Sequence, residues 1–102
     1  MMPPLTIMTS RTGSETRLVA AGEIDLSTVG ELRDAVLQAA AGADRVLLDL
    51  TRLDFIDTTG LGCLLELRST LQGRGALFEI AADEGPVRQA VHVTGLGHLL
   101  AL

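Results

Sequence analysis

Short apolar blocks follow one another along this chain, and their spacing switches regularly between the period of a strand and the period of a helix. The segments with a strand pattern are 5–9, 16–23, 45–50 and 76–81. The segments with a helix pattern begin near residues 28, 59 and 86. Strands that alternate with helices of ~10–15 residues need crossover connections. The sequence therefore predicts an α/β fold, in which three or more helices pack against a mixed, mostly parallel sheet of four to five strands.

Turn and capping residues separate the first of these segments. The cluster from Thr12 to Glu15 predicts a hairpin between the first two strands. Thr28 and Glu31 have the spacing of a capping box, in which each side chain accepts a hydrogen bond from the other residue's backbone N–H. We expect this pair to begin a helix that ends at Gly42.

A central strand is expected at Arg45–Leu50, because the continuous run Val46-Leu47-Leu48 suits a strand that is covered on both faces. Leu53 to Asp57 is interpreted as a connector that leads into a second helix, from about Thr59 to Gln72.

The last third of the chain predicts one more strand, one more helix and a tail. Pro86 suits the first turn of the helix, where its missing N–H does no harm, and Gly95 is expected to end it. Leu96 to Leu102 is expected to form a short apolar element. A chain of 102 residues is too short for two ordinary domains, so we expect one domain over residues 1–102.

Composition and charge argue against several classes of function. The formal charge is −5, no lysine is present, and the aromatic residues are two phenylalanines, so no basic or stacking surface for nucleic acid is expected. No apolar run reaches the ~18 residues of a membrane span, and a soluble, cytoplasmic protein is expected. Cys63 is the single cysteine, and His92 and His98 lack a third plausible ligand, so we expect no metal and no cofactor.

Two loops follow the ends of predicted parallel strands, where function collects in α/β folds. They are 23–26 and 54–60. The second leads into Asp57-Thr58-Thr59-Gly60-Leu61-Gly62, an unusual helix start, because two early glycines cost about 1 kcal/mol each relative to alanine. Such glycines indicate a close backbone approach to a neighbouring element or to a partner. Two hydroxyls at the positive end of a helix are also well placed to carry a phosphate.

These residues resemble the STAS domain of anti-sigma factor antagonists. The resemblance rests on Gly22-Glu23-Ile24-Asp25, on the stretch from Leu53 to Gly62 and on Val93-Thr94-Gly95-Leu96, which occur in the family's order over nearly the whole chain. It implies that the unmodified protein captures an anti-sigma factor that is also a kinase of the histidine-kinase-like ATPase fold, which frees a sigma factor. The kinase then phosphorylates the hydroxyl residue directly after the loop aspartate, here Thr58, and the antagonist lets go. A PP2C-type phosphatase is the expected partner that resets the switch.

The resemblance also assigns roles to the neighbouring residues. The surface that meets the partner is expected to contain Glu23, Asp25, Asp57, Thr58, Thr59, Gly60 and Gly62. Plainer roles stay open: Asp57 or Thr59 caps the helix, and the two glycines serve backbone geometry. The chain departs from the family in its threonine, where serine is commoner, and in Gly30 within the first helix.

Two other functions compete with this one. The aspartate-and-hydroxyl loop is similar to the nucleophile loop of haloacid dehalogenase-type phosphatases, but that chemistry needs a second carboxylate two residues later and a lysine. Thr59 stands at that position and the chain has no lysine, so we expect no enzyme activity. A STAS subunit of a lipid-transport complex or of a stress-signalling assembly remains the alternative.

Overall fold

The computed structural model describes residues 5–95 and 97, and within them it confirms the predicted order of elements. These are β1 (Leu5–Thr12), β2 (Glu15–Ile24), α1 (Val29–Ala39), β3 (Arg45–Ile56), α2 (Thr58–Gly73), β4 (Leu77–Ala81) and α3 (Pro86–Thr94). The expected apolar element at 96–102 lies, apart from Gly97, outside the described residues, as do His98 and residues 1–4.

The strands form one sheet in the order β1-β2-β3-β4. β1 and β2 pair antiparallel through the predicted hairpin, in which Gly13 takes the left-handed conformation (φ 60°). The other two pairs, β2 with β3 and β3 with β4, are parallel. The sheet is therefore mixed and mostly parallel, with three helices, as the α/β prediction requires.

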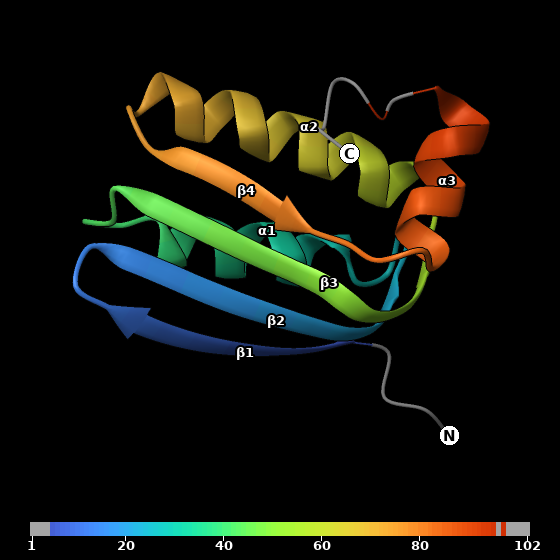
Figure 1. Cartoon of the computed structure of the whole chain (residues 1–102), viewed down its shortest axis with the longest axis horizontal. Helices are drawn as coiled ribbons and strands as arrows, with labels where there is room; N and C mark the ends of the chain where they lie inside the picture. Colours follow the sequence, from blue (N-terminus) through green and yellow to red (C-terminus); the bar gives the residue numbers. More distant parts are fainter. Residues whose placement is uncertain (1–4, 96, 98–102) are drawn as a thin grey trace.

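Both crossover helices pack on the same face of the sheet (Figure 1). Right-handed crossovers from β2 to β3 and from β3 to β4 put α1 and α2 on one side, and the two helices contact each other there. Between them and the sheet lie fully buried side chains such as Leu18, Leu48, Leu64 and Leu71. α3 stands apart from this layer, at the end of the sheet where β3 leads into α2.

The opposite face of the sheet carries charged side chains together with exposed apolar ones such as Met8 and Leu77, which corrects the expectation that the central strand is covered on both faces. Asp49 of β3 is only 7% exposed there, and its carboxylate accepts a hydrogen bond from Arg17 of β2 at 2.8 Å. Arg45 reaches Glu79 of β4 at the same distance. Leu47, the middle residue of the continuous apolar run, lies on this outer face and is half-buried, in register with Arg17 of β2 and Glu79 of β4.

Residues 53–56 form the end of β3, so their interpretation as a connector was wrong. β2 and β3 stay paired as far as Ile24 and Ile56. The pairing shifts twice, and the second shift leaves Asp54 as an extra residue between the pairs Gly22–Leu53 and Glu23–Phe55. Such a bulge breaks the two-residue alternation. Leu53 and Ile56, three residues apart, are consequently both buried.

The start of α1 also differs from the prediction, because Thr28 and Glu31 form no capping box. Thr28 is the residue before the helix, but its side chain makes no capping hydrogen bond. Its hydroxyl instead donates to the carbonyl oxygen of Glu23 at 2.9 Å and accepts from the backbone N–H of Asp25 at 3.0 Å. The turn at the end of β2 holds this hydroxyl, and Glu31 is exposed.

Candidate functional site

The ends of β2 and β3 meet the N-terminus of α2 at one end of the sheet, where the two candidate loops were expected to gather. The backbone N–H of Asp57 donates to the carbonyl oxygen of Ile24 at 3.1 Å. This bond ties the loop that carries Thr58 to the turn that carries Asp25. The predicted site residues at 23–25 and 57–62 therefore occupy one end of the molecule, beside α3 (Figure 1).

Asp57 is the residue that caps α2. Its carboxylate oxygen Oδ1 accepts a hydrogen bond from the N–H of Gly60 at 3.0 Å, and its carbonyl oxygen accepts from Leu61 at 3.1 Å. The helix consequently begins at Thr58, one residue before its expected start. Of the two candidate caps, Asp57 fills the role and Thr59 does not.

Thr58 occupies the first helical position and its side chain is exposed, whereas Thr59 is half-buried. Within residues 5–95 no hydrogen bond engages the Thr58 hydroxyl, and it is Asp57 that satisfies the N–H of Gly60. A negative charge at this position is favourable for the helix, because α2 presents its positive dipole end here. The geometry leaves the hydroxyl accessible to a modifying enzyme.

Gly60 and Gly62 differ sharply in their surroundings. A Cβ atom on Gly60 would lie 2.6 Å from Cγ1 of Ile56 and 2.7 Å from Cγ2 of Ile24, so α2 approaches both strand ends closely. No heavy atom lies within 4 Å of a Cβ atom on Gly62, which is exposed. The predicted close approach to a neighbouring element thus exists at Gly60, and packing within the described chain does not require Gly62.

Asp25 lies half-buried in the turn after β2. Its Oδ1 accepts from the hydroxyl of Ser27 at 2.7 Å and from the N–H of the same residue at 2.9 Å. The hydroxyl hydrogen bond from Ser27 is the main cause that lowers the pKa of the Asp25 carboxyl below its ordinary value. Asp25 therefore keeps a negative charge throughout the physiological range. Glu23, half-buried at the end of β2, pairs in register with Phe55 of β3.

A groove beside Thr58 was not predicted. It has a volume of about 520 Å³ and lies between the end of β3, the start of α2 and α3. Its apolar walls include Leu61 and Ala90 together with Phe55 and Val93, which are 45% and 84% exposed. One sequence feature could have indicated this groove: Val93 is an apolar residue that falls outside the buried stripe of its helix, which Val87 and Val91 form.

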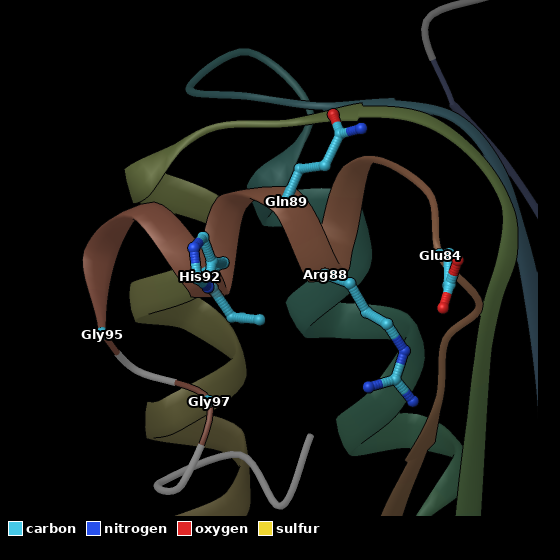
Figure 2. Close-up of a pocket in the computed structure, with 7 residues that line it drawn as sticks. Glu84, Arg88, Gln89, His92, Gly95 and Gly97 are labelled. Carbon is cyan, nitrogen blue, oxygen red and sulfur yellow. The ribbon is translucent and has the colours of Figure 1, made fainter.

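A second hollow, of about 540 Å³, lies along α3 (Figure 2). Its polar side chains come from Glu84, Arg88, Gln89 and His92. His92 is exposed. In the described part of the chain, no group of three or more histidine, cysteine, aspartate or glutamate residues is arranged to hold a metal ion. No helix among these residues is long and apolar enough to cross a membrane.

Comparisons with known proteins agree on one family. The family model described as MlaB, STAS domain matches residues 7–101. A STAS-domain containing protein of Pseudomonas aeruginosa (strain UCBPP-PA14) is 26% identical over 98 residues, which cover 96% of this chain and 97% of that protein.

Among solved structures, an anti-sigma factor antagonist from Mycobacterium paratuberculosis has a TM-score of 0.81 and 25% identity, over 92% of this chain and 80% of that chain. The anti-sigma factor antagonist SpoIIAA in its unphosphorylated form has a TM-score of 0.71 and 21% identity, over 92% and 84%. The phosphorylated form, described as a Bacillus cell fate determinant, has a TM-score of 0.69 and 20% identity, over 92% and 87%. The SpoIIAA matches show the fold, and with the family match over residues 7–101 they lead to one conclusion: the chain belongs to the STAS domain family.

Proposed function

We propose that this protein is an anti-sigma factor antagonist, which binds an anti-sigma factor kinase and releases it when Thr58 is phosphorylated. One observation carries the proposal: the exposed Thr58 hydroxyl stands at the first position of α2, directly after an aspartate that caps the helix by itself. The likeness to an anti-sigma factor antagonist from Mycobacterium paratuberculosis supports it. SpoIIAA, which shares the fold, has been solved in a phosphorylated form.

The proposed binding surface combines the groove with the acidic residues around it. Phe55 and Val93 offer apolar contacts next to Thr58, and Asp25 and Asp57 place carboxylates at the same end of the sheet. A partner that inserts an apolar side chain and surrounds it with basic groups would match both features. Gly62 belongs to this surface too, since an exposed glycine with open space above it lets a partner approach the backbone of α2.

Release follows from charge. A phosphate on Thr58 adds about −1.5 to −2 charges. At an assumed separation of ~6 Å and an effective dielectric constant of ~40, its repulsion with the adjacent Asp57 is about 2 kcal/mol. Burying these charges against a partner adds a desolvation penalty of several kcal/mol. Because every ~1.4 kcal/mol is tenfold in affinity, we expect the affinity for the partner to fall by two to four decades.

The decisive experiment offers the purified protein a candidate anti-sigma factor kinase and ATP. The wild type should take up one phosphate on Thr58 and lose the partner, while Thr58→Ala should bind permanently and take no label. Thr58→Asp should fold normally and bind poorly. Ser69→Ala is the matched control, since Ser69 is an exposed hydroxyl residue of α2 about three turns from Thr58, and this variant should be phosphorylated and released like the wild type. Tight binding by a folded Thr58→Asp protein would contradict the release mechanism.

The remaining parts of the proposal concern partners and setting. The protein acts as a binding protein rather than as an enzyme, and it needs no cofactor or metal for this role. Its partners are a kinase of the histidine-kinase-like ATPase fold and a PP2C-type phosphatase that removes the phosphate. The proposal places these reactions in the cytoplasm, without direct contact with nucleic acid or membrane.

A second candidate is a STAS subunit of a lipid-transport complex or of a stress-signalling assembly, because the family match over residues 7–101 covers the domain without distinguishing its partners. In that role the groove would hold a constant partner, and Thr58 would contact it without being modified. The neighbouring genes distinguish the two: a kinase and a sigma factor support the switch, and a transporter ATPase supports the subunit. Stable co-purification with such an ATPase, unaffected by kinase and ATP, would decide for the second candidate.

A further inference from the structure

Thr28 has a buried hydroxyl that forms hydrogen bonds with the backbone of the turn after β2. The residue is only 2% exposed. Its Oγ1 donates to the carbonyl oxygen of Glu23 at 2.9 Å and accepts from the N–H of Asp25 at 3.0 Å. One hydroxyl thus satisfies a donor and an acceptor of the backbone on the two sides of Ile24. A side chain used in this way contributes to the shape of the turn rather than to the start of α1.

The same turn is bonded to the loop that carries Thr58. The carbonyl oxygen of Ile24 accepts the N–H of Asp57 at 3.1 Å, and the Ile24 side chain fills the space that a Cβ atom on Gly60 would need. The position of Ile24 therefore affects both the cap and the first turn of α2. Thr28 fixes the residues on each side of Ile24, although it contacts neither Asp57 nor Thr58 in the hydrogen bonds described.

We propose that Thr28 is a positioning residue. It holds Glu23 and Asp25 in a fixed position relative to Thr58, so that the two loops present one preformed surface to the partner. This inference rests on the proposed function for its partner. A surface held in its binding conformation loses less conformational freedom on association. If the turn became mobile, apparent affinity would fall in proportion to the fraction of molecules in the competent conformation.

The test replaces the hydroxyl with a methyl group. Thr28→Val keeps the shape of the side chain and removes these two hydrogen bonds, together with a longer one of 3.4 Å from Oγ1 to the Asp25 carboxylate, whereas Thr28→Ser keeps the hydroxyl. Thr16→Val is a matched control: Thr16 is also 2% exposed, lies near the opposite end of β2, and its Oγ1 has no hydrogen-bond partner among the described residues. If Thr28→Val does not fold, Thr28→Ala takes its place.

Binding and phosphorylation are measured with the anti-sigma factor kinase. Thr28→Val should raise the Kd for the kinase and the KM for phosphorylation of Thr58 about tenfold and leave kcat within twofold, because a preformed surface acts in binding and not in the chemical step. Thr28→Ser and Thr16→Val should stay within twofold of the wild type. Unchanged Kd and KM in a folded Thr28→Val protein would overturn the proposal, as would an equal effect of Thr16→Val.

Amide hydrogen exchange in the free protein separates this inference from the proposed function. The N–H groups of Asp25 and Asp57 should exchange at least tenfold faster in Thr28→Val than in Thr16→Val, measured against amides of the core strands. If the wild type neither binds the kinase nor takes a phosphate, the proposed function fails. The exchange rates then decide alone whether Thr28 positions the turn. If the N–H groups of Asp25 and Asp57 exchange as slowly in Thr28→Val as in Thr16→Val, that role is refuted.

Discussion

Replacing Gly60 and Gly62 with alanine, one at a time, should change the stability of the protein in opposite directions. The two residues lie two positions apart in the first turns of α2, so a general rule for glycine in helices predicts the same gain for both. Their surroundings differ: the added methyl group meets two isoleucines at Gly60 and open space at Gly62. Comparing the two variants therefore separates the effect of packing on stability from the effect of helix propensity.

The magnitudes follow from these contacts. Gly62→Ala should raise the free energy of unfolding by about 1 kcal/mol, the difference in helix propensity. Gly60→Ala gains the same amount, but contacts of 2.6 and 2.7 Å with carbons of Ile56 and Ile24 force both strand ends and the helix apart. Overpacking of this kind costs about 1–3 kcal/mol. Because both isoleucines are buried and belong to different strands, we expect the upper part of this range, about 2–3 kcal/mol, which leaves a net loss of about 1–2 kcal/mol after the gain in helix propensity.

Urea unfolding followed by circular dichroism measures both changes, and thermal unfolding should separate the two variants by roughly 10–20 °C for a chain of this size. Gly30→Ala is the control for propensity alone, since Gly30 is an exposed glycine of α1 with no heavy atom within 4 Å of the added Cβ atom. A Gly60→Ala protein as stable as the wild type would show that α2 does not need this close approach. A Gly62→Ala protein less stable than the wild type would refute the reasoning at the other position.

The same variants bear on function. Gly62→Ala should weaken binding to the kinase although the protein becomes more stable, because its methyl group stands on the proposed interaction surface. Gly30→Ala, with a similar gain in stability, should bind as the wild type does. Wild-type affinity in Gly62→Ala would remove Gly62 from the binding surface and leave the placement of Thr58 unaffected.

Three further predictions concern stability and reactivity. Arg11→Met should lower the free energy of unfolding by about 1–2 kcal/mol in urea titrations, because the Arg11 guanidinium donates to the carbonyl oxygens of Ala41 and Gly42 beyond α1; an unchanged urea midpoint would contradict this. The pKa of Asp49 is lowered: burial opposes its charge, but hydrogen bonds from Thr51 and Arg17 outweigh burial. The stabilisation from the Asp49 carboxylate is therefore complete above the unfolded pKa and is lost as the pH falls through the folded pKa. Below about pH 3.8, the free energy of unfolding measured in urea should fall less for Asp49→Asn than for the wild type. Equal losses in the two proteins would show that the Arg17–Asp49 ion pair does not contribute to stability. Burial raises the pKa of the Cys63 thiol, so iodoacetamide should modify it only in denaturant, and rapid labelling of the native protein would show that the α1–α2 layer opens.

Much of the fold was predictable because its signals are local. Pro86 and Gly95 bound α3 as expected, and Gly95 takes the left-handed conformation (φ 72°) that ends a helix. The stretch Gly73-Arg74-Gly75 likewise ends α2. The placement of Asp57 and Asp25 at one end of the sheet follows from topology, since the carboxyl ends of neighbouring parallel strands lie together.

The errors occurred where a partner distant in sequence, or a competing local hydrogen bond, decides the structure. The bulge at Asp54 exists because β2 stays paired with β3 as far as Ile56, and nothing within residues 53–57 indicates that pairing. The hydroxyl of Thr28 had two possible uses, a cap for α1 or a tie to the turn, and the spacing to Glu31 favoured the wrong one. The groove needed three elements to be placed in space before Phe55 and Val93 could be seen to share a wall.

The division of work between Asp57 and Thr58 explains how a modification could change binding without changing the fold. Asp57 provides the cap through its carboxylate, and its N–H joins α2 to the end of β2. The Thr58 side chain takes part in neither contact and points to the surface. A phosphate there adds charge at the positive end of a helix whose first turn is already satisfied, so it disturbs no described hydrogen bond. Its electrostatic effect then falls on whatever meets the groove beside it, which is the property that a switch operated through a partner requires.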